Sequence, residues 1–486
     1  MYHWLPINSK DDLSKLSEFG YITSEYDPVN VADKLSDGIS SAVKSILIEK
    51  NYIDKDYRST YYNFYSKKGH FYRSDCVRLH FFDETVQFDP TRLTLTCKDN
   101  DLSDHYFGYM VLRPTGIGTI GRSVVSPDVR TGSSGLTISA KHKTHVLGYT
   151  LEVEGFPSMD QHLDISVCAH AACRSILRHY SNKFKSYRQF LTQDITMMAQ
   201  SFDPGGIIPS QGLDVSNAER VFQQAGTFPV LISKIDGNDA LFYRQLISYV
   251  ESELPLFAAM WSIGHAIVVI GHEWDHSKKL ENGKDEHYSW DQVKSLVVID
   301  DNHLPYLTVE HGGGKDYKIE DIDAFIVALP EKVFYPAEAV DELAQNLFYL
   351  RNLIKLPPKD ETIIRYFLTT GSKLRRFIRR VQSEFDPELL KSVMGLPLTQ
   401  FIWVIEFATE NEWETGQISA RAIVDGTAGL RENYPLWFFH NRETALVFDR
   451  VKIDRSNPGI SQFSLTGMAN TALTRMNQNL RPTKSK

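Results

Sequence analysis

The amino-acid sequence predicts an α+β fold, and the order of its patterns along the chain carries that prediction. The segment 151–330 reads as helices first and antiparallel strands afterwards. Before it, 1–150 reads as an α/β-rich region, with a helical pattern followed by alternating, aromatic-rich runs typical of strands. After it, 337–455 mixes both patterns, and the last stretch, 456–486, lacks acidic residues and is predicted to be a flexible tail.

Composition bounds the class of protein. Hydrophobic residues make up 42% and charged residues 23% of 486 residues, which is typical of folded domains. The net charge of −8 argues against a chain-wide nucleic-acid footprint. The N-terminus shows no secretory signal, and no apolar run reaches the roughly 20 residues that span a bilayer. Four cysteines in so long a chain form no disulfide framework, so we expect a cytoplasmic protein.

The pattern of the central segment predicts helices first and strands afterwards. A helix is expected to open at Cys168, and others over 186–199, 215–225 and 241–253. Four strand-like runs then follow, L-F-A-A-M-W, A-I-V-V-I-G, S-L-V-V-I-D and A-F-I-V-A-L. The fold expected here is a cysteine-bearing helix packed on an antiparallel sheet.

Cys168 is the cysteine whose position favours reactivity. A thiol attacks as its thiolate, and a helix N-terminus favours an anion. Asp164 and Ser166 are plausible caps just upstream, whereas Cys173 lies deeper in the helix and reads as buried structure. A base should come from a separate element, and His265 follows a glycine and precedes a strand-forming run.

The residue that orients the base should come from the neighbouring strand end. That strand, S-L-V-V-I, ends in Asp300, Asp301 and Asn302. Side chains alternate along a strand, so the two acids are expected to face opposite ways. From the residues alone the choice among the three depends on register and stays open.

The block from 159 to 306 resembles the C39-like branch of the papain-like cysteine peptidases. The matching pieces are D-Q-H-L-D-I-S-V-C-A-H-A-A, G-L-D-V-S-N-A-E-R-V-F-Q-Q-A-G, L-P-L-F-A-A-M-W-S-I-G-H-A-I-V-V-I-G-H and V-V-I-D-D-N-H-L-P-Y. The resemblance implies a papain-like core and a peptidase that acts on polypeptides without a metal or organic cofactor.

The resemblance also implies roles for individual residues. Cys168 would be the nucleophile, His265 the base and Asp301 the orienting acid, with Asp300 as the fallback. Gln161 would help to form the oxyanion hole, although its spacing from the cysteine is one residue longer than the family pattern. Ala169 stands where the family usually has glycine after the cysteine.

Other readings remain open. A catalytically inactive copy of the fold could serve as a binding or scaffolding protein. His272-Glu273-Trp274-Asp275-His276 matches the zinc-hydrolase string H-E-x-x-H, but it follows a strand and leads into a polar loop. Gly116-x-Gly118-x-x-Gly121 matches a dinucleotide motif, but no helix is expected after it.

A cluster of basic residues is the remaining signal. Arg365, Lys373, Arg375, Arg376, Arg379 and Arg380 fall in a segment, 360–384, that is expected to form one helix. A solvated basic face is the first interpretation, and a docking surface for an acidic partner, or less favourably a nucleic acid, is the alternative. No membrane association is expected.

Overall fold

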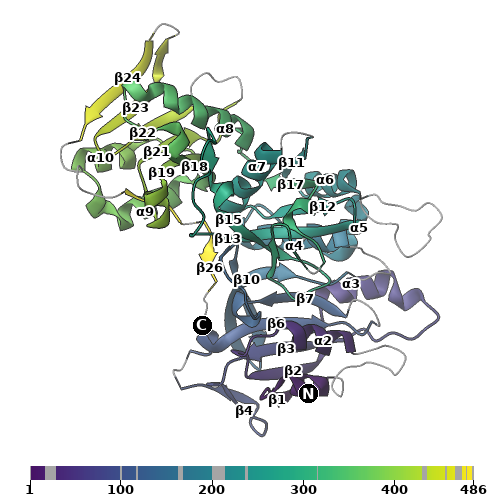
Figure 1. The fold of residues 1–486 in the computed structure, drawn as a ribbon. Helices are drawn as coiled ribbons and strands as arrows, with labels where there is room; N and C mark the ends of the chain where they lie inside the picture. Colours follow the sequence, from purple (N-terminus) through teal and green to yellow (C-terminus); the bar gives the residue numbers. More distant parts are fainter. Residues whose placement is uncertain are drawn as a thin grey trace.

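The computed structural model describes most of the chain, with short gaps. The described residues are 2–16, 29–98, 101–115, 119–161, 168–199, 214–235, 239–314, 316–429, 435–454, 457–465, 473–477 and 479–483. Helices and antiparallel sheets are mixed along their whole length, so the fold is α+β. Each of the main sheets belongs to a different third of the chain, and the central sheet lies between the other two (Figure 1).

The N-terminal region is built on an antiparallel sheet. Its neighbouring strands are, in order, β1 (Tyr2–Pro6), β2 (Ser45–Tyr52), β3 (Cys76–Phe82), β6 (Tyr106–Leu112), β7 (Ile120–Val125), β10 (Tyr149–Ser158) and β9 (Ala140–Val146). A hairpin of β4 (Gln87–Asp89) and β5 (Thr94–Thr96) and the helices α2 (Val29–Gly38) and α3 (Lys55–Asn63) complete it. Because β10 belongs to this sheet, the region extends to about 158 and not to 150.

The predicted site residues His265, Asp300 and Asp301 lie in strands of the central sheet or directly after them. Its order is β11 (Phe228–Ser233), β17 (Ala324–Leu329), β12 (Leu256–Met260), β13 (His265–Trp274), β15 (Val293–Ile299) and β16 (Leu307–Glu310). The preceding helices are α4 (Cys168–Lys183), α5 (Thr192–Ala199), α6 (Val215–Gln224) and α7 (Asp239–Glu251). All four strand-like runs of the sequence form neighbouring strands of this sheet, as expected for continuous apolar runs that are buried on both faces.

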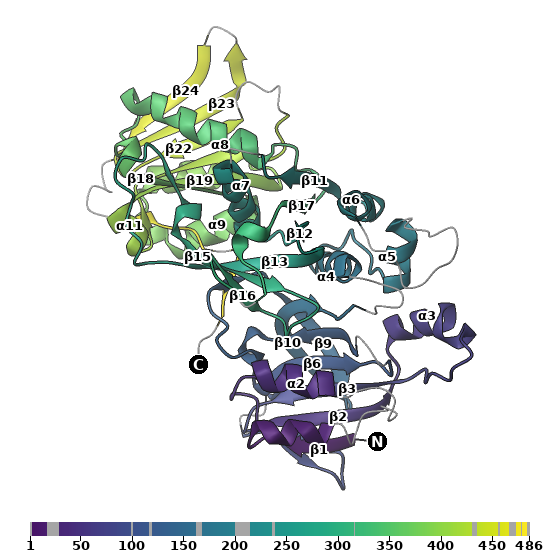
Figure 2. The same cartoon turned by 45° about the vertical axis from the view of Figure 1, so that its right-hand side comes forward.

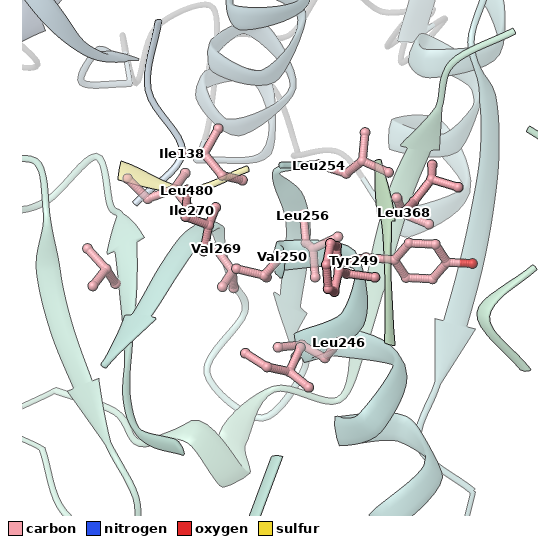
Figure 3. Close-up of a cluster of buried hydrophobic side chains, with 14 of the residues drawn as sticks. Ile138, Leu246, Tyr249, Val250, Leu254, Leu256, Val269, Ile270, Leu368 and Leu480 are labelled. Carbon is pink, nitrogen blue, oxygen red and sulfur yellow. The ribbon is translucent and has the colours of Figure 1, made fainter. Parts of the chain in front are cut away.

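The central sheet is covered on both faces. Helix α4 contacts β13 and β12 on one side and strands β10 and β9 of the N-terminal sheet on the other. Helix α7 also contacts β13, and in Figure 3 its Val250 lies beside Val269 of that strand. Side chains alternate along a strand, so α4, which meets Ala266 and Val268, and α7, which meets Val269, cover opposite faces.

The C-terminal region forms a further sheet. Its order is β14 (His287–Tyr288), β18 (Thr362–Thr370), β19 (Phe401–Thr409), β21 (Ala420–Asp425), β22 (Leu436–His440), β23 (Thr444–Asp454) and β24 (Asn457–Ser464). Its helices are α8 (Ala337–Asn346), α9 (Gly371–Arg380), α10 (Pro387–Gly395) and α11 (Glu410–Glu414). Strand β14 comes from the central segment and pairs in parallel with β18, which ties the two regions together.

The expectation of one helix over 360–384 is wrong. Thr362–Thr370 is the strand β18, and the helix begins only at Gly371. The run T-I-I-R-Y-F-L-T-T is rich in β-branched and aromatic residues, which favour a buried strand. Arg365 therefore does not belong to the basic helix, and its side chain is buried.

The expectation of a flexible tail over 456–486 is also wrong for its described parts. They form β24, β25 (Leu473–Thr474) and β26 (Arg481–Pro482). Strand β25 pairs with β20 (Gln417–Ile418), and β26 pairs with β8 (Leu136–Thr137), which in turn pairs with β13. Acid-free composition signals a tail only when no distant strand pairs with it. Here Leu480 packs with Ile138 and Ile270 (Figure 3).

None of the helices in the described part of the chain combines the length and apolar character needed to cross a bilayer.

Candidate active site

Cys168 is the first residue of α4. This helix lies between the N-terminal and central sheets (Figure 2). The small residues Ala169, Ala171 and Ala172 are buried beside it, which lets the sheets approach the helix closely. Cys168 is partly exposed as a residue, whereas Cys173 is fully buried. The expected caps Asp164 and Ser166 lie outside the described residues.

His265 is the first residue of β13, and it lies at the end of the sheet next to Cys168. Gly264 turns the chain into the strand with a φ of +63°, a left-handed conformation that a β-carbon disfavours. Nε2 of His265 lies 3.1 Å from Oδ1 of Asp300, and the ring is also hydrogen-bonded to Cys168. Since Nε2 faces Asp300, Nδ1 is the nitrogen left for the thiol.

These contacts set the protonation of His265. Burial lowers the pKa of the ring, but hydrogen bonds to Asp300 and Cys168 and their negative charges raise it to about 10. The imidazolium form is therefore favoured at neutral pH. The ring thus presents a positively charged donor to Cys168 at the N-terminus of α4.

Asp300 is held on all sides. Its Oδ1 accepts from the backbone N–H of Asn302 at 2.8 Å, and its Oδ2 accepts from the Tyr317 hydroxyl at 2.7 Å. Burial raises the pKa of Asp300, but the bond to His265, the charge of His265 and these two donors lower it below its usual range. An ionised, fixed carboxylate on Nε2 is what orients an imidazole base.

Asp301 does not make the contact that the sequence predicted for it. Its Oδ1 lies 3.9 Å from Nε2 of His265, and neither carboxylate oxygen is hydrogen-bonded by a described residue. Burial, the charge of Asp300 and that of Asp160 raise the pKa of Asp301. The geometry thus favours the fallback, Asp300, because β15 ends at Ile299 and both acids lie in the turn beyond it, where strand alternation no longer applies.

Gln161 lies in the stretch of chain that joins the last strand of the N-terminal sheet, β10, to Cys168. Arg113 anchors this stretch by donating from Nη2 to the backbone oxygens of Asp160 at 3.1 Å and Gln161 at 3.4 Å. The oxyanion role of Gln161 stays a prediction, since the segment that joins it to Cys168 is outside the described residues.

Sequence reasoning missed the residues that come from distant segments. Tyr317 holds Asp300, and Lys34 of α2 donates to the Asp160 carboxylate at 2.9 Å and to the backbone oxygen of Asp301 at 3.1 Å. Neither residue stands in a motif. Only the contact between the N-terminal region and the central sheet brings Lys34 to the site.

The H-E-x-x-H string does not lie on a helix. His272 is in β13, fully buried, with Nε2 bonded to Glu251 of α7, and His276 follows in a turn beyond the strand. The two imidazoles therefore do not share a helical face, which a zinc-hydrolase motif requires. In the glycine motif, Gly116 and Gly118 lie outside the described residues, and Gly121 is in strand β7, so no helix opens there.

The basic cluster is smaller than the sequence indicated. Arg365 is buried in an ion-pair network, Lys373 is paired with Glu253, and Arg375 donates to the Leu396 backbone oxygen. Arg376 is exposed on α9, and so are Arg379 and Arg380. The surface left for an acidic partner is this exposed face alone.

Comparisons with protein-family models, with curated proteins and with solved structures find no match for this chain.

Proposed function

We propose that the chain is a cysteine-dependent amide hydrolase, a peptidase with a papain-like core. One observation carries the proposal: the thiol of a partly exposed cysteine at a helix N-terminus shares one imidazole with a fixed, buried carboxylate. The order Cys168, His265, Asp300 along the chain and the helix packed on an antiparallel sheet support the same reading.

The chemistry follows from these contacts. The Cys168 thiolate attacks the carbonyl carbon of an amide and forms a C–S bond, while the carbonyl π electrons move to oxygen. The first backbone N–H groups of α4, with Gln161, would stabilise this oxyanion. The C–N bond then breaks as the His265 imidazolium gives its Nδ1 proton to the leaving amine. Water, deprotonated by His265, next attacks the thioester and releases the carboxylic acid and the thiol.

Thiol labelling tests this proposal without a known substrate. The full-length chain is treated at pH 6 with iodoacetamide, and the labelled peptides are quantified by mass spectrometry over time. An ordinary thiol has a pKa near 8.5 and is less than about 1% thiolate at this pH. Cys97, which is also partly exposed, is the internal control.

We expect Cys168 to react at least about 100-fold faster than Cys97. Equal rates would reject the hydrolase and favour the inactive scaffold, whose contact surface would then be sought on the exposed face of α9. If Cys168 is labelled, substrates can be sought with the Cys168→Ala variant, which should retain bound peptides without cleaving them.

A further inference from the structure

Asp301 and its neighbours form a cluster that the proposed hydrolysis does not fully use. One nitrogen of His265 and one carboxylate oxygen each of Asp300 and Asp301 lie within 4.8 Å of one another. Nε2 of His265 is 3.1 Å from Asp300 and 3.9 Å from Asp301. An imidazole with two carboxylates supplies the nitrogen and oxygen donors that zinc and similar divalent ions take, with a position left open.

The state of Asp301 points independently to a missing ligand. Its exposed fraction is only 6%, and neither carboxylate oxygen is hydrogen-bonded by a described residue. Together with Cys168 it lines a small cavity between α4 and the central sheet. A buried carboxylate without partners is costly, and either a proton or a cation removes that cost.

The cationic side chains around the cluster bind other groups and leave the Asp301 carboxylate without a donor from the described residues. The Lys34 ammonium donates to the Asp160 carboxylate, and it contacts Asp301 only at the backbone oxygen. Arg130, which senses the charge of Asp300, donates to the Leu304 backbone oxygen. The three carboxylates of Asp160, Asp300 and Asp301 face the cationic side chains of Lys34, Arg113 and Arg130, besides His265, but no described residue donates to the Asp301 carboxylate. The Tyr317 hydroxyl donates to Oδ2 of Asp300 at 2.7 Å and fixes its orientation, as hydrogen bonds to metal ligands commonly do.

We propose that His265, Asp300 and Asp301 bind a divalent transition-metal ion of the Zn²⁺ type. The metal takes the lone pair of Nε2, and the proton that Nε2 had donated to Asp300 is released to water. The proton that remains on the ring is then on Nδ1. The binding site stands on its own geometry and does not depend on the proposed function.

Calorimetric titration of the full-length chain with ZnCl₂, in buffer without thiols or chelators, tests the site. We expect one ion per chain and a loss of affinity of at least about tenfold in Asp301→Asn, as for removal of one ligand. Asp316→Asn is the matched control, because Asp316 is an exposed carboxylate close by, paired with His303. Thermal melts show that each variant is folded, and Asp301→Ser serves if the amide variant is not.

Equal affinity in the wild type, Asp301→Asn and Asp316→Asn would overturn the proposal. Loss of affinity in Cys168→Ser but not in Asp301→Asn would also overturn it, because the ion would then sit on the thiol. Zinc binding that depends on Asp301, in a chain whose Cys168 never labels, would reject the hydrolase and keep the metal site.

Discussion

Strand β13 carries two histidines that are paired with buried acids, and the two pairs differ in almost every other respect. His265 begins the strand, its side chain is 14% exposed, and it faces Asp300 and a thiol. His272 lies seven residues further on, its side chain is 0% exposed, and it faces Glu251. The same two residue types thus occur once at an open end and once in a sealed interior.

The sealed pair belongs to a network in which the two carboxylates, of Glu251 and Glu406, have every oxygen paired. Arg365 donates from Nε to Glu251 at 2.6 Å and from Nη1 to Glu406 at 2.7 Å. Arg421 donates to the other oxygen of Glu406 at 2.8 Å, and the backbone N–H of Met476 donates there at 3.0 Å. At the open pair, by contrast, Asp301 is left without a hydrogen bond from any described residue. Carboxylates with every oxygen paired indicate a structural role, and an unpaired acid beside a thiol indicates chemistry.

The sharpest way to break this comparison is to remove each histidine in turn. His265→Ala should lower the labelling rate of Cys168 by about 10²–10⁴-fold, the range lost with a general base. His272→Ala should leave the rate per folded molecule unchanged while lowering the free energy of unfolding, because it opens a cavity beside Glu251. Both quantities come from one set of labelling and urea-denaturation experiments. A rate loss in His272→Ala that matches that of His265→Ala would contradict the division of roles.

The second test disturbs the sealed network. Arg365→Leu leaves Glu251 and Glu406 without their main partner, and removing one member of a buried ion pair costs about 3–5 kcal/mol. Urea denaturation of the full-length chain measures this loss. Arg379→Leu, on the exposed face of α9, is the matched control and should change the free energy of unfolding by less than about 0.5 kcal/mol. Similar values for the two variants would mean that the network contributes little.

The third test compares Asp300 and Asp301, the two acids beside His265. Asp300→Asn removes the carboxylate that holds Nε2 and should slow the labelling of Cys168 by about 100-fold, as expected when a partner that orients a catalytic imidazole is lost. Asp301→Asn should be affected at least about tenfold less, because its carboxylate makes no hydrogen bond to the ring. The reverse order would restore the role that the sequence assigned to Asp301.

The fourth and smallest effect is the dependence of stability on pH. The folded pKa of His265, about 10, lies above the value of about 6.5 for an unfolded histidine. The stability that protonated His265 provides is therefore complete below about pH 6.5 and is lost as the pH rises towards 10, with a slope of at most about 1.4 kcal/mol per pH unit. Urea midpoints between pH 6 and 10 should fall less steeply in His265→Gln than in the wild type. Parallel curves would show that the folded protein does not raise the pKa of His265.

The sequence was sufficient for those parts of the site that depend on local pattern. Cys168 does open a helix and His265 does begin a strand, because helix-start and strand signals are read within a few residues. Asp301 was preferred over Asp300 because a family pattern was applied to residues that lie in a turn. The side-chain directions in that turn depend on Tyr317 and Asn302, whose bonds to Asp300 no pattern shows.

Residues of the sealed network were misread for a related reason. Arg365 was counted with the arginines of the following helix, since a run of basic residues is usually a solvated face. Its acidic partner Glu251 is 114 residues away in the chain. In a sequence, a buried charge cannot be told from a surface charge unless its partner is known. A single sequence does not show which distant residues pair in this way.

The return of the chain to the central sheet through β26 has a consequence for the order in which the protein can be completed. Thr483 bonds to Gly135 across 348 residues, and β26 closes on β8, the neighbour of β13. On the ribosome, the central segment emerges long before this strand exists, so the edge at β8 stays open while the C-terminal sheet is still being made. Domains generally fold as they are synthesised, beginning at the N-terminus. Here β8, which flanks β13 at Gly271 and His272, acquires its partner β26 only after residue 483 has been translated, so a chain stalled earlier would carry the His272 end of the strand beside an unpaired edge.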